Sequence, residues 1–302
     1  MDLSGLIPEW NELWERCPGA TPFQSPEWLV PWWDSFHPGR LKCLERRDAG
    51  RLAGFAPLYE DDSGIVRLLG AGNTDYLDVL VEPGCGVDWI YEQAGNAFFH
   101  DLPPHSPLVA GAPQWARISE GEVCPVLELP ATVEEWRERL PHGLKRNLRR
   151  YGERFPEPRY SAGRDPNLLE DLFFLHGARW SRMRGQPGVT SDEAVRRFHR
   201  AVARGFAQRG WLRFWTLHSG ERLAAIIYAF ACRGRAYLYL DGFEPSLARF
   251  GPGTLTIGYA IESAISEGIR ELDFLRGAEP YKFAWGARAR RNVNIVFRPP
   301  AR

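Results

Sequence analysis

The segment from Tyr237 to Trp285 limits the possible folds more than any other part of the chain. Alternating Tyr and Leu residues at 237–240 predict a β-strand, and apolar residues at helical spacing over 254–267 predict an α-helix. Gly268 ends this helix, and the sequence Leu-Asp-Phe-Leu at 272–275 predicts a second strand. Two strands joined through one helix predict a βαβ unit, because parallel neighbours need a crossover connection.

The N-terminus of this predicted helix is an expected anion site, because its unpaired N–H groups and the helix dipole favour negative charge there. Gly251 and Gly253 lie at this point. The arrangement resembles the acetyl-CoA-binding core of the GNAT N-acyltransferases. Residues 274–286, which read FLRGAEPYKFAWG, resemble the end of the Fem-like and CelD-like branch of that superfamily. The resemblance extends over nearly the whole chain and implies acyl transfer.

The composition predicts a globular protein with no general affinity for nucleic acid. The chain has 302 residues, of which 44% are hydrophobic, enough to bury the cores of two domains. Lys plus Arg and Asp plus Glu both number 38, so the formal net charge is zero. No global field then attracts DNA or a membrane, and any anion site must be local.

The cysteines and the N-terminal residues predict a reduced, cytoplasmic setting. Five cysteines are scattered along the chain without a CxxC pair, so we expect free thiols and no metal. The first residues carry early acidic side chains and no basic region followed by an apolar run. No stretch approaches the roughly 18 uninterrupted apolar residues of a membrane-spanning helix. We therefore expect a cytoplasmic protein without an integral membrane segment.

Two parts of the chain have the same order of predicted elements. Arg51-Leu52-Ala53 aligns without a gap on Arg222-Leu223-Ala224, and each part contains a Pro-Gly pair, Pro83-Gly84 in one and Pro252-Gly253 in the other. In both parts a Pro-Gly loop, a helix and another strand follow three strands, the last strand of the first part being Pro107–Ala110. The six preceding strands are predicted at 41–46, 52–59 and 65–69, and at 212–218, 223–231 and 237–240. We infer an internal duplication.

This duplication and the GNAT resemblance together predict an α/β (α+β) fold of two tandem GNAT-like units. Each unit should be a mixed, mainly antiparallel sheet flanked by helices. The N-terminal unit is expected at 1–120 and the C-terminal unit at 121–302, with the last strand, 292–298, able to return to the first unit. The boundary follows from a basic helix that Fem-like enzymes have at the start of their second domain.

The basic run at 144–151 has two interpretations. Lys and Arg are good helix formers and mostly exposed, so the run fits a solvated helix face. It also fits a contact with phosphate, a nucleotide-sugar or the acceptor stem of a tRNA. The cations are Lys145, Arg146, Arg149 and Arg150.

The resemblance implies an acyl-CoA, such as acetyl-CoA, as the donor. The residues assigned to it are Arg249, Gly251, Gly253 and Thr254. The match to the GNAT glycine loop is incomplete, because Ala248 occupies the position of its Arg or Gln. Pro252 also removes one N–H that the loop would offer a pyrophosphate. The sequence therefore leaves acyl-CoA and aminoacyl-tRNA open as donors.

The candidate catalytic residues are Asp75, Asp78, Tyr281 and Lys282. Asp75 and Asp78 occupy the place of a Fem-like segment that contributes a proposed base, and the alternative is that both aspartates cap turns. By resemblance Tyr281 lines the acyl site and Lys282 stabilises an anionic group. Either could instead be an ordinary surface residue.

A second set of residues is predicted to contact substrate. His176, Arg179 and Trp180 share one helix face, from which Fem-like enzymes present an Arg to the acceptor. The alternative is a helix packed by its Trp, with the Arg paired to a carboxylate. The other members of the set are Tyr76, Tyr239, Asp241 and Arg276.

The sequence thus predicts an N-acyltransferase that moves an acyl group to an amine on a small molecule, sugar or cell-envelope precursor. Asp75 is expected to face Tyr281 and Lys282 across a cleft. A tRNA is a less favoured partner. The alternatives are a Fem-like, aminoacyl-tRNA-dependent transferase and a non-catalytic binding protein with the same fold.

Overall fold

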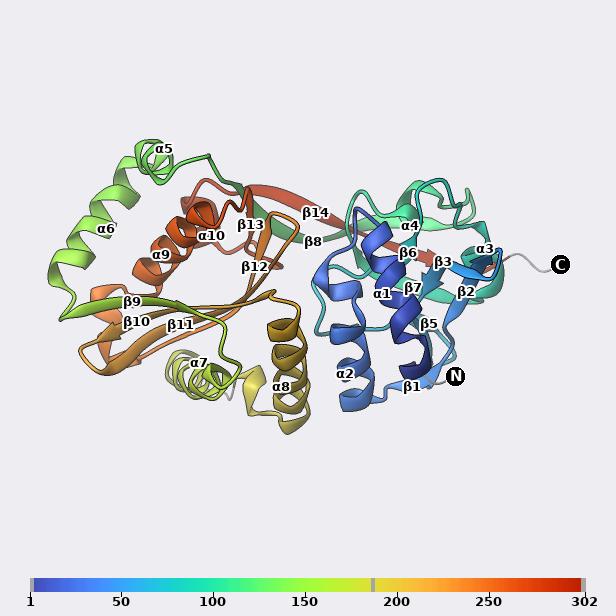
Figure 1. Ribbon diagram of the computed structural model, residues 1–302, viewed down its shortest axis with the longest axis horizontal. Helices are drawn as coiled ribbons and strands as arrows, with labels where there is room; N and C mark the ends of the chain where they lie inside the picture. Colours follow the sequence, from blue (N-terminus) through green and yellow to red (C-terminus); the bar gives the residue numbers. More distant parts are fainter. Residues whose placement is uncertain (1–2, 186–187, 300–302) are drawn as a thin grey trace. The chain divides into compact units, whose positions relative to one another are not determined.

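The computed structural model describes residues 3–185 and 188–299, apart from the side chains of Arg179, Met183 and Arg184. The chain forms two compact units (Figure 1). Unit 1 comprises the residues up to Val123 together with those from Arg290 on, and unit 2 comprises Cys124–Ala289. Each has a mixed sheet with helices against it, which confirms the predicted α/β (α+β) fold class.

Unit 1 is built around a sheet in the order β1-β4-β5-β7-β14-β8, beside a small sheet β2-β3-β6. The pairs β1–β4, β4–β5 and β7–β14 are antiparallel, and β5–β7 is parallel. The elements are α1 (Ile7–Arg16), α2 (Pro26–Phe36), β1 (Gly39–Leu41), β2 (Leu44–Asp48), β3 (Arg51–Ala56), β4 (Leu58–Asp61), β5 (Val66–Leu68), β6 (Leu80–Val81), α3 (Asp88–Gln93), β7 (Ala97–Leu102), α4 (Pro107–Ala110), β8 (Arg117–Glu128) and β14 (Arg288–Phe297).

Three predicted strands of unit 1 differ from the structure. The predicted strand 41–46 is divided into the end of β1 and the start of β2, which pair in different sheets. Pro107–Ala110 is the short helix α4, because Ser106 accepts a hydrogen bond from the N–H of Leu108 and Pro107 takes the first helical position. The strand that follows α3 is β7. The predicted strand 52–59 is divided at Pro57 into β3 and β4, which pair in different sheets. Proline has no N–H for a strand ladder, so the break falls there.

Unit 2 has the sheet order β8-β13-β12-β11-β10-β9. Its strands are antiparallel neighbours except β12 and β13, which are parallel and connected through α9. This confirms the predicted βαβ unit. The elements are α5 (Val133–Arg139), α6 (His142–Arg154), β9 (Pro158–Gly163), α7 (Leu168–Arg184), α8 (Glu193–Gln208), β10 (Leu212–Ser219), β11 (Arg222–Cys232), β12 (Arg235–Phe243), α9 (Pro252–Ser266), β13 (Glu271–Asp273) and α10 (Pro280–Ala284).

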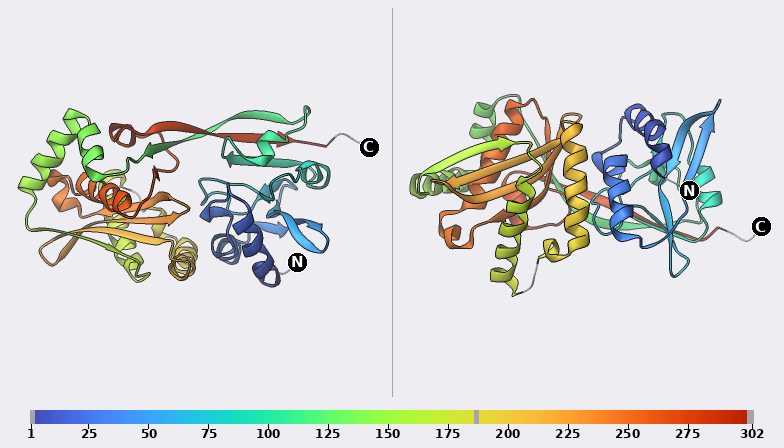
Figure 2. Two further views of the ribbon diagram at one scale, coloured as in Figure 1. Left: turned by 45° about the horizontal axis from the view of Figure 1, so that its top comes forward. Right: turned by 60° about the horizontal axis from the view of Figure 1, so that its bottom comes forward.

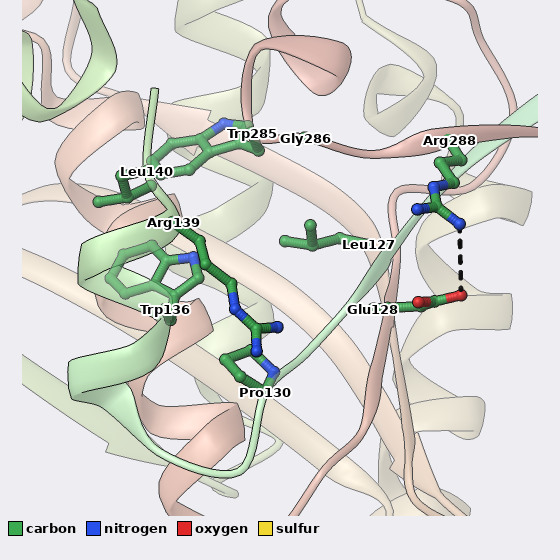
Figure 3. Close-up of a pocket in the computed structure, with 9 residues that line it drawn as sticks. All are labelled: Leu127, Glu128, Pro130, Trp136, Arg139, Leu140, Trp285, Gly286 and Arg288. Atoms are coloured by element: carbon green, nitrogen blue, oxygen red, sulfur yellow. Dashed lines mark ion pairs between the residues drawn. The ribbon is translucent and has the colours of Figure 1, made fainter. Parts of the chain in front are cut away.

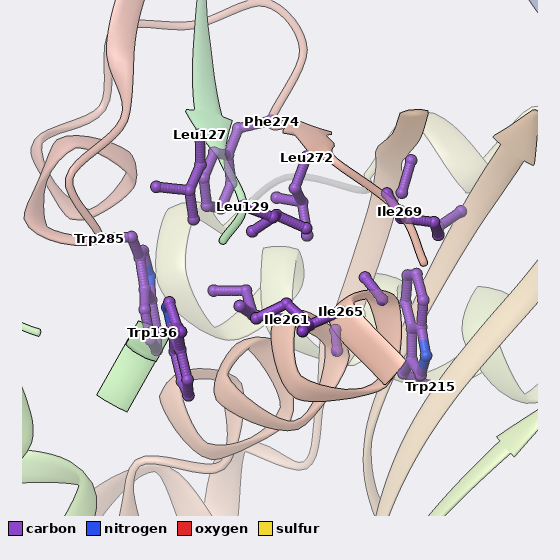
Figure 4. Close-up of a cluster of buried hydrophobic side chains, with 14 of the residues drawn as sticks. Leu127, Leu129, Trp136, Trp215, Ile261, Ile265, Ile269, Leu272, Phe274 and Trp285 are labelled. Carbon is purple, nitrogen blue, oxygen red and sulfur yellow. The ribbon is translucent and has the colours of Figure 1, made fainter. Parts of the chain in front are cut away.

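Helices cover both faces of the unit 2 sheet (Figures 1 and 2). On one face α7 packs on β11 and β12, and on the other α9 packs on β10 and β11. The core under α9 gathers apolar side chains from α5, α9, the sheet and the segment after α10 (Figure 4). Ile261, Leu272 and Trp215 are fully buried there. Burial of such side chains stabilises the fold by about 1.5–3 kcal/mol each, so this core fixes the position of α9.

Candidate functional site

A pocket of about 290 Å³ lies in unit 2 where β12 ends and α9 begins. We call it the α9 pocket. Its walls come from α6, the end of β12, the first turns of α9, and α10 with the residue after it. They are Leu144, Asn147, Tyr151, Asp241, Phe243, Gly253, Thr254, Ile257, Tyr281, Ala284 and Trp285. Four predicted site residues, Asp241, Gly253, Thr254 and Tyr281, therefore share one pocket.

The first turn of α9 offers two backbone N–H groups to this pocket. The N–H of Gly251 donates to Ala248 O and that of Leu255 donates to Gly251 O, both at 3.0 Å. Pro252, at the first helical position, has none. The amides of Gly253 and Thr254 have no acceptor among the described residues. With the dipole of a 15-residue helix behind them, they form an anion site with two donors.

Gly251, the residue before α9, has a backbone conformation that a side chain would disturb. Its φ of 64° is left-handed, and a Cβ built on it would lie 2.5 Å from the ring of Tyr151. Tyr151 itself lines the pocket, with the guanidinium of Arg150 4.9 Å from its ring centroid. The predicted donor residue Gly251 thus seats α9 against α6. Arg249 is exposed, and its guanidinium lies 4.7 Å from the ring centroid of Phe250.

The α9 pocket opens where β13 stops following β12. Their pairing covers three residues and ends at Tyr237 and Asp273, whereas β12 continues to Phe243. The buried carboxylate of Asp273 accepts a hydrogen bond from the N–H of Leu275, at 2.8 Å, and Leu275 has a left-handed φ of 58°. The chain therefore turns away from β12 at this residue and leaves space beside the strand.

Lys282 holds the segment after this turn. Its Nζ donates to the backbone carbonyls of Leu275, Arg276 and Gly277, at 3.3, 2.7 and 3.2 Å. Glu279 lies 3.0 Å from the same nitrogen, and only 6% of the Lys282 side chain is exposed. The ammonium group is thus surrounded by acceptors of the protein itself. These contacts make Lys282 a positioning residue for the 275–279 turn, while a contact with substrate stays a prediction.

The remaining residues near the turn differ in exposure. Tyr281 is 43% exposed and lines the α9 pocket, so its phenol is accessible to a ligand there. Arg276 is half-buried, and its carbonyl is the nearest of the three acceptors of Lys282.

The other predicted substrate contacts lie on the α7–α8 face of the sheet. His176 is 4% exposed, and its Nδ1 lies 2.9 Å from the backbone oxygen of Asp241. Because a carbonyl only accepts, Nδ1 carries the proton. Trp180 and Tyr239 pack against imidazoles here, with ring centroids 5.8 Å from His176 and 5.1 Å from His199. The side chain of Arg179 lies outside the described residues. A β-bulge at Tyr239 shifts the register of β12 just before Asp241.

In unit 1, the segment 70–78 that contains Asp75, Tyr76 and Asp78 is anchored by indoles of α2. The indole N–H of Trp28 donates to Thr74 Oγ1, at 2.7 Å, and that of Trp32 to Asn73 Oδ1, at 3.2 Å. Tyr76 is 2% exposed beside Phe23, so its ring is part of the core. Asp75 is 9% exposed, and its backbone oxygen accepts a hydrogen bond from Asn292.

The carboxyl group of Asp78 in this segment has a displaced pKa. It accepts hydrogen bonds from Ser106 Oγ, at 2.7 Å, and from the N–H of Val79, at 2.9 Å. Withdrawal from water raises its pKa to about 7, although both hydrogen bonds oppose the change. The carboxyl borders a second pocket, of about 270 Å³, in unit 1. Proton exchange near neutral pH is therefore possible at this site.

The residues of α6 that line the α9 pocket were not predicted from the sequence. Leu144, Asn147 and Tyr151 follow one another at spacings of three and four residues, which places them on one helix face. This spacing is visible in the sequence, but the cations between these residues favoured an interpretation as phosphate binding.

No group of three His, Cys, Asp or Glu in the described part of the chain could hold a metal ion. Among the described helices, none has the length and apolar character needed to cross a bilayer.

Comparison with protein families finds one domain in unit 2. Residues 140–283 match the acetyltransferase (GNAT) domain model. Comparison with curated protein sequences finds no significant match. The matched residues include α6, Lys282 and every residue that lines the α9 pocket apart from Ala284 and Trp285. This match agrees with the resemblance to GNAT N-acyltransferases that the sequence predicted for this segment.

Solved structures extend the likeness to the whole chain. FemX has a TM-score of 0.68 at 8% identity, covering 97% of this chain and 96% of that chain. The C-terminal domain of a putative lysylphosphatidylglycerol synthetase from Agrobacterium fabrum has a TM-score of 0.63 at 8% identity, with coverages of 98% and 92%. A tandem GNAT protein from the clavulanic acid biosynthesis pathway has 0.50 at 15% identity, with 99% and 97%. At these identities the likeness is one of fold, and it confirms the Fem-like, tandem GNAT architecture.

Proposed function

We propose that the protein is an N-acyltransferase that binds an acyl thioester, with acetyl-CoA as the expected donor, in the α9 pocket. The observation that supports this most is the pair of Gly253 and Thr254 amides at the N-terminus of α9, inside a pocket of about 290 Å³. A pyrophosphate is a suitable ligand for such amides. Arg249 and Arg150, near the same end of the helix, add positive charge.

The reaction needs a base for the attacking amine and an acid for the leaving thiolate. Tyr281 is the proposed acid, since its phenol is accessible in the α9 pocket. Asp75 and Asp78 remain the proposed base candidates. The amine nitrogen would form a bond to the acyl carbon as the carbon–sulfur bond breaks, the amine proton passing to the base and the thiolate taking the Tyr281 proton. The pairing of Asp75 with Tyr281 and Lys282 stays a prediction.

The proposed acceptor is an amine on a small molecule, sugar or cell-envelope precursor. The FemX likeness supports an envelope precursor by analogy of fold. Incubating the purified protein with acetyl-CoA and a panel of amino sugars, nucleotide-sugars and peptide precursors, and measuring the release of free thiol, tests this class. Turnover with none of these would contradict the acceptor proposal and leave donor binding to be judged separately.

Donor binding is tested most sharply by restoring the N–H that Pro252 lacks. Pro252→Ala adds a third amide to the first turn of α9, so acetyl-CoA should bind about tenfold more tightly, the gain expected from one more hydrogen bond to a charged group. Pantetheine is the control ligand. It has no pyrophosphate, so its affinity should be the same for Pro252→Ala and for the natural protein. Calorimetry measures both. Equal effects on the two ligands, or no binding of acetyl-CoA to either protein, would reject the site.

A Fem-like use of aminoacyl-tRNA is the second candidate, and one feature favours it. No residue of α6 is buried, and its cations Lys145, Arg146, Arg149, Arg150 and Arg154 are exposed. The only acid of the helix, Glu153, lies 3.7 Å from Arg149. If charged tRNA is the donor, its affinity should fall steeply between low and physiological salt. Binding of neither acetyl-CoA nor charged tRNA would leave the non-catalytic alternative.

A further inference from the structure

Unit 2 has a second pocket beyond α10, of about 240 Å³, to which no function has been assigned (Figure 3). It lies between the end of β8, helix α5 and the turn from α10 into β14. Its walls are Leu127, Glu128, Pro130, Trp136, Arg139, Leu140, Trp285, Gly286 and Arg288. Trp285 is the one residue that it shares with the α9 pocket. We call it the α5 pocket.

The α5 pocket contains a buried hydrogen-bond donor without an acceptor. Trp136 is 4% exposed, and its indole N–H has no partner among the described residues. In Figure 3 the nitrogen edge of this ring faces the interior of the pocket. The ring lies nearly parallel to that of Trp285, at 15° with centroids 6.4 Å apart. A buried N–H that finds no acceptor costs about 1–3 kcal/mol.

Several other buried indoles of the protein do have an acceptor for their N–H. The N–H groups of Trp10 and Trp14 donate to the backbone oxygens of Gln24 and Thr21, both at 2.9 Å. Trp28 donates to Thr74. The N–H of Trp215 also lacks an acceptor within the described part of the chain, but Trp215 is not part of the α5 pocket wall. The unsatisfied N–H of Trp136 therefore marks a position for a ligand oxygen.

Two guanidinium groups border the same pocket. Arg139 and Arg288 are 68% and 85% exposed. Their acidic neighbours Glu135 and Glu128 lie 3.9 and 4.0 Å away, beyond hydrogen-bonding distance. Both guanidinium groups therefore keep N–H donors for a ligand. Because Glu128 is itself in the wall, the pocket favours a single negative charge over a dianion.

We propose that the α5 pocket binds a small carboxylate with an apolar or aromatic body. The carboxylate would accept the Trp136 N–H and face Arg139 or Arg288. Its apolar body would lie against Leu127, Leu140 and the two indoles, since such surface gains from leaving water. A phosphate monoester would bind worse, because its second charge meets Glu128. This site is separate from the proposed donor site and does not depend on it.

The indole N–H signal of Trp136 in a ¹⁵N–¹H NMR spectrum is a direct test, assigned by its loss in Trp136→Phe. Benzoate, phenylacetate and hexanoate are titrated, with benzyl alcohol and phenyl phosphate as comparison ligands. A carboxylate should move the Trp136 signal downfield as the N–H gains an acceptor. Trp136→Phe, which keeps an aromatic ring, should bind the same carboxylate about tenfold more weakly.

Arg139→Gln provides a second, independent variant, because this exposed side chain can be changed without loss of packing. It should also weaken the carboxylate, whereas acetyl-CoA should bind Trp136→Phe and Arg139→Gln as it binds the natural protein. The proposal is wrong if the Trp136 signal does not move with any carboxylate, or if benzyl alcohol moves it equally. It is also wrong if both variants retain full carboxylate affinity. Loss of acetyl-CoA binding alone would concern the donor proposal instead.

Discussion

The two units have different helices at their Pro-Gly pairs. In unit 2, α9 starts at Pro252 itself and continues for 15 residues, so its N-terminus points two amides into the α9 pocket. In unit 1, the helix after Pro83-Gly84 begins only at Asp88 and has six residues. Its short length leaves a weak dipole and no comparable anion site. The comparison teaches that a shared order of elements does not carry a binding site with it.

The strands that precede these helices also differ, and again the more regular element is in unit 2. β11 is continuous over 11 residues between β10 and β12. Its counterpart in unit 1 is divided at Pro57 between two sheets. A divided strand cannot form one flat platform for a long helix. The donor-binding role is therefore proposed for unit 2 alone, and the following predictions test this difference.

The largest expected effect comes from Gly251→Ala, with Gly84→Ala as its matched control. Both glycines have a left-handed φ, of 64° and 87°, but only at Gly251 would a Cβ meet a ring. The left-handed backbone costs about 1–2 kcal/mol at either site, and the clash with Tyr151 adds about 1–3 kcal/mol at Gly251. Chemical denaturation and acetyl-CoA calorimetry measure the two effects. Loss of donor binding with Gly84→Ala as well would contradict the assignment to unit 2.

A smaller effect is expected from Lys282→Met, with Lys42→Met as the control in unit 1. The substitution Lys282→Met leaves three backbone carbonyls without their donor, which should lower the free energy of unfolding by about 1–3 kcal/mol. Lys42→Met removes only an ion pair with the partly exposed carboxylate of Glu60, which should cost less. The 275–279 turn should loosen and hydrogen exchange of its amides should quicken. Lys282→Arg should restore part of the protection. Unchanged exchange together with lost turnover would instead indicate that Lys282 acts on substrate.

Acid should weaken unit 2 through His199. Burial, with a smaller contribution from His176, lowers the pKa of His199 from 6.5 to about 3. The unfolded chain then binds a proton that the folded chain refuses, so stability falls as pH drops from about 6.5 towards 3. The slope is at most about 1.4 kcal/mol per pH unit. Hydrogen exchange of β10–β12, corrected for intrinsic rates, should show this slope, and His199→Gln should remove it.

A trend of opposite sign, over a slightly narrower pH range, is expected in unit 1 from Asp78. Its raised pKa, about 7 against 3.8, means that the folded chain holds a proton that the unfolded chain releases. Stability of unit 1 should thus fall as pH rises from about 4 to 7 and then level off. Asp78→Asn, which keeps an acceptor for Ser106, should flatten the exchange profile of β7. If the stability of both units changed with pH in the same direction, the opposite effects proposed for His199 and Asp78 would be contradicted.

The parts that could be predicted from sequence are those fixed by local periodicity. The strand–helix–strand order around Pro252 follows from spacing alone, and the break at Pro141 separates α5 from α6 as expected. The apolar run at Pro107–Ala110 is ambiguous between strand and helix, although Ser106-Pro107 carried a helix start signal. Pro57 was equally visible, but its consequence, a change of sheet, depends on partners far along the chain.

The site was less predictable because its contacts are tertiary. Gly251 and Tyr151 are 100 positions apart in number, and nothing local shows that a ring closes on that glycine. The acceptors of Lys282 are backbone carbonyls, which every residue possesses, so no residue type signals them. The unsatisfied N–H of Trp136 is equally invisible in the sequence.

Strand β14 has a consequence for synthesis on the ribosome. Val293–Phe297 pairs with β7, and Asn292 donates to the backbone of Asp75, so unit 1 includes residues made after all of unit 2. The unit that emerges first is completed last. A chain truncated before Arg290 should therefore contain a complete unit 2 and an N-terminal part that still lacks one of its strands, and that part is where chaperones would be needed longest.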